Sequence, residues 1–80
     1  MNRSFLELLE AEKRVFIDVK YFKESAIDFL NKAETESNHE GREACKRLAS
    51  EYEDQASKAE EELLQIRKEM KQYISFLETL

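Results

Sequence analysis

The fold of this chain is decided by residues 45–80, which read CKRLASEYEDQASKAEEELLQIRKEMKQYISFLETL. Apolar residues recur in this stretch at alternating steps of four and three positions. The series consists of Cys45, Ala49, Tyr52, Ala56, Ala59, Leu63, Ile66, Met70, Tyr73, Leu77 and Leu80. A period of 3.5 residues sustained over about five heptads is typical of a coiled-coil seam. The sequence therefore predicts a long helix that packs against another helix along its length.

The first half of the chain carries a broader apolar pattern. One row of apolar residues consists of Leu8, Ala11, Val15, Val19, Phe22, Ala26, Phe29 and Ala33, and a flanking row adds Phe5, Leu9, Phe16, Ile27 and Leu30. At about 100° per residue, the two rows cover an arc of roughly 160°. One partner helix needs a narrower stripe than this, so we expect this helix to contact at least two neighbours. Ser4 and Glu7 have the spacing of a capping box, which places the helix start at Ser4.

A stretch without large apolar residues, from Thr35 to Arg42, separates the two patterns. It contains Gly41, the only glycine, and Ser37 and Glu40 repeat the capping-box spacing. One continuous helix is the alternative interpretation. It would place a row of polar residues at seam positions, which disfavours a straight coiled coil.

The predicted fold is therefore all-α: a single antiparallel helical hairpin, coiled-coil-like, over residues 1–80. We expect the first helix at about 4–36, the turn at about 36–41 and the second helix at about 38–80. A chain of 80 residues buries only about 60% of its unfolded surface, so a lone hairpin would be marginally stable. We expect it to self-associate into a four-helix bundle, as a homodimer.

The predicted pairing also determines which residues share a level of the hairpin. Folding the chain near Asn38 brings the large Phe22 and Phe29 level with the small Ala56 and Ala49. Large side chains against small ones fill a helix interface densely. Glu12 and Lys23 fall inside the broad apolar arc, and we expect each to lie at its edge with a packed stem and a solvated head group.

Composition excludes several classes of protein. Charged residues make up 39% of the chain and the net charge is −5, whereas a nucleic-acid-binding face needs clustered positive charge. No apolar run approaches the length of about 18 residues that crosses a membrane. Cys45 is the only cysteine, so no internal disulfide can form. We expect a soluble, cytoplasmic protein that binds neither nucleic acid nor membrane.

One motif in the sequence has the spacing of a metal-binding site. Glu36 and His39 form the only E-x-x-H, a spacing that supplies metal ligands in some helical bundles. His39 is the only histidine and lies at the predicted turn, so we favour a solvated residue. We expect no catalytic site, no cofactor and no enzymatic activity. A metal-binding bundle that uses Glu36 and His39 is one alternative.

The most informative functional residues are apolar ones outside the helix seams. They are Leu6, Ile17, Tyr21, Leu64 and Phe76, and they form a candidate partner surface. Together with the seam, they favour a small acidic helical module for protein–protein interaction, such as an adaptor, an assembly factor or a small chaperone. Leu80 is itself a seam residue, so a segment of a longer coiled-coil scaffold is a further alternative.

Overall fold

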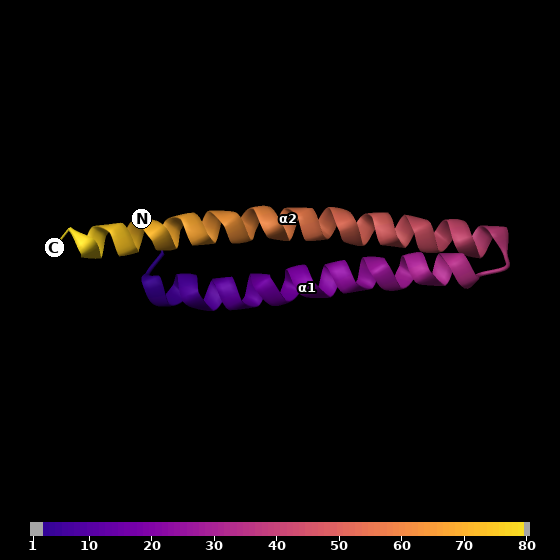
Figure 1. The fold of residues 1–80 in the computed structure, drawn as a ribbon, viewed down its shortest axis with the longest axis horizontal. Coiled ribbons are helices and arrows are strands. Elements are labelled where there is room, and N and C mark those ends of the chain that lie inside the picture. Colours follow the sequence, from indigo (N-terminus) through magenta and orange to yellow (C-terminus); the bar gives the residue numbers. More distant parts are fainter. Residues whose placement is uncertain (1–2, 80) are drawn as a thin grey trace.

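The computed structural model describes residues 3–79 and consists of two antiparallel helices packed side by side (Figure 1). Helix α1 spans Phe5–Thr35, and helix α2 spans His39–Glu78 and runs back alongside it from the turn. The hairpin measures 63 × 16 × 14 Å. The predicted all-α hairpin is confirmed. Over the described residues, neither helix contains an apolar stretch that would cross a membrane.

Both helices begin at side-chain caps. The Ser4 hydroxyl accepts a hydrogen bond from the Glu7 N–H at 3.2 Å, as the sequence predicts. At the turn, the Asn38 side-chain oxygen accepts hydrogen bonds from the Glu40 and Gly41 N–H groups, at 2.8 and 3.3 Å. The cap of α2 is therefore Asn38, one residue later than the spacing of Ser37 and Glu40 suggests. An asparagine cap satisfies backbone N–H groups that have no partner within the helix.

Loss of the Asn38 cap should weaken the fold. We expect Asn38→Ala to lower the free energy of unfolding by about 1 kcal/mol, because two backbone donors lose their acceptor. Urea denaturation followed by circular dichroism measures this change. Ser37→Ala is the control, since the cap does not use the Ser37 side chain. Equal losses in the two variants would contradict the assignment of Asn38 as the cap.

The core is uneven along the hairpin. At the end away from the turn, the open end, the buried cluster consists of Leu8, Ala11, Val15, Val19, Ala59, Leu63 and Ile66. Towards the turn, the buried residues are all alanines, namely Ala26, Ala33, Ala49 and Ala56. Large aliphatic side chains therefore stabilise the open end, and the fully buried side chains near the turn are methyl groups.

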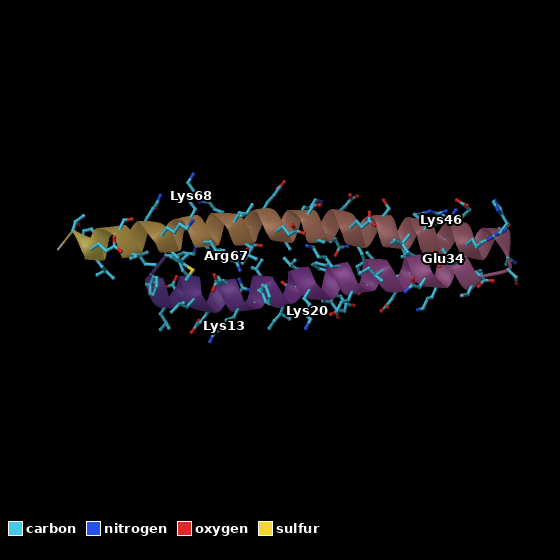
Figure 2. The ribbon with its side chains drawn as sticks, in the orientation of Figure 1. Lys13, Lys20, Glu34, Lys46, Arg67 and Lys68 are labelled. Atoms are coloured by element: carbon cyan, nitrogen blue, oxygen red, sulfur yellow. The ribbon has the colours of Figure 1, made fainter. Side chains whose placement is uncertain are left out.

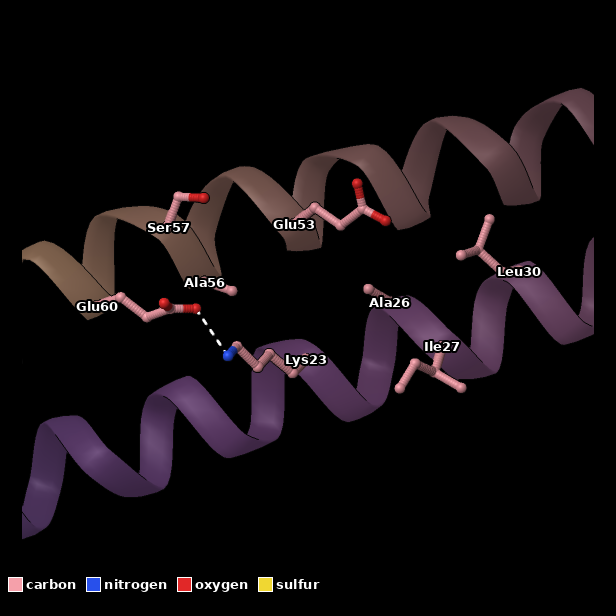
Figure 3. A pocket seen from close by; sticks show the side chains of 8 residues that line it. All are labelled: Lys23, Ala26, Ile27, Leu30, Glu53, Ala56, Ser57 and Glu60. Carbon is pink, nitrogen blue, oxygen red and sulfur yellow. Dashed lines mark ion pairs between the residues drawn. The ribbon is translucent and has the colours of Figure 1, made fainter.

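Near the turn, aromatic rings of the two helices pack together. The Phe29 ring stacks on Tyr52 at 5.7 Å between centroids, and Phe22 approaches the same ring at 6.2 Å. Two phenylalanine rings of α1 therefore share one aromatic neighbour on α2. Figure 3 shows Ala26 and Ala56 between the two helices, displaced from each other along the hairpin, with Ala56 near the level of Lys23.

Helix α2 is longer than α1 and extends past it at the open end (Figure 1). The Phe5 ring meets the Tyr73 ring at 5.8 Å, and the Tyr73 hydroxyl donates to the Arg3 carbonyl. Because α1 begins at this level, Leu77 has no opposing turn of α1 and is 60% exposed. The structure thus differs from the seam predicted at Leu77. Leu80, the last predicted seam residue, lies outside the described residues.

Candidate interaction surfaces

The predicted seam residues differ in burial. Five are buried, namely Ala49, Ala56, Ala59, Leu63 and Ile66, and four are half-buried, namely Cys45, Tyr52, Met70 and Tyr73. The half-buried members are larger or lie close to an end of the hairpin. One neighbouring helix shields them on one side only.

An apolar stripe along α1 stays uncovered by α2. Its members are Leu9, Phe16, Ile27 and Leu30, and we call this set the α1 stripe. Leu9 is half-buried, whereas Phe16, Ile27 and Leu30 are 53%, 57% and 42% exposed. Leu9, Phe16 and Leu30 are separated by multiples of seven residues, so they share one side of the helix. The α1 stripe is the flanking row of the broad arc, without Phe5, and the single neighbour in the hairpin leaves it in solvent.

A groove of about 320 Å³ opens beside the α1 stripe. Helix α1 contributes Lys23, Ala26, Ile27 and Leu30, and α2 contributes Glu53, Ala56, Ser57 and Glu60 (Figure 3). The two alanines lie between the helices, and their short side chains leave the space open. The groove therefore follows from the same alanine layers that make the core thin near the turn.

Two ion pairs join the helices on this side of the hairpin. Lys23 Nζ lies 2.9 Å from Glu60 Oε1 (Figure 3), and Arg67 Nε donates to Glu12 Oε2 at 3.2 Å. The charged groups are partly exposed, so Glu12 and Lys23 lie at the edge of the apolar arc, as predicted. Exposed pairs of this kind contribute about 0–1 kcal/mol each, so they orient side chains more than they stabilise the hairpin.

Phe16 lines a second, shallower hollow near the open end, together with Glu12, Lys13 and Arg67. Figure 2 shows Lys13 and Lys20 on the outer edge of α1 and Arg67 between the two helices. The exposed phenylalanine ring is therefore surrounded by charged side chains. Burial of such apolar surface under a partner would lower the free energy of the complex.

The candidate partner surface predicted from the sequence does not gather on one face. Its five residues, Leu6, Ile17, Tyr21, Leu64 and Phe76, are 56–67% exposed. Ile17 lies about 200° around α1 from the centre of its buried side, so it points away from α2. Leu64 lies about 110° around α2 from the centre of its buried side, on the flank that also carries Ser57 and Glu60. Phe76 lies on the segment of α2 that extends past α1.

Tyr21 differs from the other members of that set because it contacts aromatic neighbours. Its ring approaches Phe22 at 5.6 Å and Tyr52 at 6.2 Å. The pKa of Tyr52 is raised above its usual value of 10.0, chiefly by the neighbouring Tyr21 hydroxyl.

Glu36 of the predicted metal motif makes contacts within the turn. Glu36 accepts a hydrogen bond from the Asn38 N–H at 3.1 Å, and its side chain packs over Gly41. His39 is exposed and is the first residue of α2. Within residues 3–79, no group of three or more His, Cys, Asp or Glu side chains is arranged to hold a metal ion. The geometry therefore gives Glu36 a structural role in the turn.

Comparison with models of known protein families, with curated proteins and with solved structures gave no match. The function has to be argued from the surfaces themselves.

Proposed function

We propose that this protein is a small acidic helical interaction module that binds other helices and self-associates into a four-helix bundle. The observation that carries the proposal is the α1 stripe, in which three large apolar side chains are 42–57% exposed beside a groove. A helix with a broad apolar arc gains stability when a second neighbour covers the remainder of that arc.

A role in assembly suits these surfaces better than catalysis. Among the described residues, His39 lies at the start of α2 and Cys45 lies two turns further along the same helix, so no nucleophile–base pair is indicated. An adaptor, an assembly factor or a small chaperone would use an extended helical surface of this kind. A cytoplasmic location is part of the proposal, since the lone Cys45 is compatible with a reducing compartment.

Self-association can be tested by light scattering coupled to size-exclusion chromatography. We expect a mass of about 19 kDa at micromolar concentration, twice the 9.5 kDa of one chain. Dilution should shift the protein towards the monomer and lower its melting temperature, because dimer stability depends on concentration. A 9.5 kDa species with full helicity and a cooperative, concentration-independent melt would contradict the self-association.

A further inference from the structure

We propose that the groove is filled by Phe16 of a second copy, with the two α1 helices packed against each other in antiparallel orientation. This inference rests on the self-association proposed above and specifies its geometry. It assigns one occupant to the groove and one partner to the α1 stripe.

The α1 side of the groove has the form of a hole for one side chain. Lys23, Ala26, Ile27 and Leu30 occupy positions i, i+3, i+4 and i+7 of the helix. In knobs-into-holes packing, four residues at this spacing surround one side chain of the facing helix. Ala26 and Ala56 form the floor, so the hole is deep enough for a large ring (Figure 3).

Phe16 is the matching knob. It is 53% exposed and shares the side of α1 on which the hole opens. A two-fold axis that passes between the two α1 helices at the level of residue 21 would place Phe16 of each copy level with Ala26 of the other. Residue 21 lies close to the midpoint of α1, so the two α1 helices would overlap over almost their whole length. Such an interface is self-complementary, as a two-fold dimer requires.

The distribution of apolar residues selects α1 as the partner of α1. On the side of the hairpin with the groove, α2 presents mainly polar and charged residues, namely Glu53, Ser57, Glu60 and Arg67, and one exposed apolar residue, Leu64. Stacking α1 on the partner's α2 would therefore bury Phe16 and Ile27 against charged groups, which is costly without pairing. Stacking α1 on the partner's α1 covers apolar residues with apolar residues.

Net charge selects the antiparallel orientation. Residues 21–61, the half with the turn, contain 6 basic and 11 acidic residues and so carry the whole net charge of −5. The other half contains 7 of each and is neutral. A parallel pair would place the two acidic halves together, and their repulsion would oppose binding. An antiparallel pair places each acidic half against a neutral one.

The available area is that of one helix face on each copy. Helix α1 has 31 residues and is about 46 Å long at 1.5 Å per residue, and a helix with its side chains is about 10 Å across. One face over this length covers roughly 460 Å², or roughly 900 Å² for two copies. An interface of this size is typical of a weak dimer that dissociates on dilution.

The first experiment compares Phe16→Asp with Ile17→Asp. Both residues are exposed and apolar, but only Phe16 lies in the α1 stripe. We expect Phe16→Asp to raise the dimer dissociation constant at least about tenfold, measured by analytical ultracentrifugation, and Ile17→Asp to leave it unchanged. Phe16→Ala provides a milder variant if Phe16→Asp loses helicity. A dimer weakened by Ile17→Asp and not by Phe16→Asp would overturn the inference.

The second experiment determines the orientation by cross-linking in a Cys45→Ser background. Lys13 and Asn31 are exposed and lie on the same edge of α1, 18 residues or about 27 Å apart. We expect a short bismaleimide to join a mixture of Lys13→Cys and Asn31→Cys chains, and neither variant alone. Links within each variant alone would overturn the antiparallel arrangement and leave self-association intact. A wild-type monomer would overturn both proposals.

Discussion

Replacing Ile66 with alanine is expected to lower the free energy of unfolding by about 2–5 kcal/mol. Ile66 is 0% exposed and belongs to the cluster of buried residues at the open end, which also contains Leu8 and Val15. The substitution removes apolar contacts and leaves a cavity that two straight helices cannot easily close. Proteins of this size are stable by only a few kcal/mol, so the variant should be largely unfolded at 37 °C.

Leu64→Ala is the matched control for Ile66→Ala, because Leu64 is on the same helix and 67% exposed. Its effect on stability should stay within about 0.5 kcal/mol. Urea denaturation at equal chain concentrations measures both variants. The assignment of the core would be wrong if the two substitutions were equally destabilising.

The second large effect is expected from overpacking at Ala49, which is 1% exposed. Because Ala49 is almost fully buried, the added carbons of a leucine must displace neighbouring atoms of α1 or adopt a strained rotamer. Overpacking of a buried site typically costs about 1–3 kcal/mol. We expect Ala49→Leu to lower the melting temperature and to reduce the cooperativity of the transition.

Ala44→Leu isolates the packing effect from helix propensity. Ala44 is exposed on the same helix, and alanine and leucine have similar helix propensities. Ala44→Leu should therefore melt like the wild type. If Ala49→Leu matched it, the close approach of the helices at the alanine layers would be refuted.

The hairpin could be predicted from the sequence because its main signals are local. The 3.5-residue period predicts the long helix, and Ser4 predicts the start of α1. The exposure of Leu77 could not be predicted, since it depends on where the end of α1 lies against α2. The packing of Phe22 and Phe29 on Tyr52 could not be predicted for a related reason. A residue's level along the hairpin does not determine the direction in which its side chain leaves the helix.

The candidate surface was only partly accessible to sequence reasoning. The width of the apolar arc indicates that α1 needs a second neighbour, and the α1 stripe consists of residues from that arc. Ile17 and Leu64, in contrast, each lie off the seam of their own helix. Whether they share one face of the hairpin depends on the rotation of one helix relative to the other, and neither helical pattern determines that rotation.

The uneven core has a consequence for the order of folding. A hairpin that closes progressively from its turn forms its alanine layers and the stack of Phe29 on Tyr52 before any of its buried large aliphatic residues meet. Bringing Leu8 to Ile66 encloses 58 residues, whereas bringing Ala26 to Ala56 encloses 30, and the longer loop costs only about 0.6 kcal/mol more in chain entropy. Each large aliphatic residue that becomes buried contributes about 1.5–3 kcal/mol. The transition state for folding should therefore contain contacts between the two ends of the chain, with the turn consolidated afterwards.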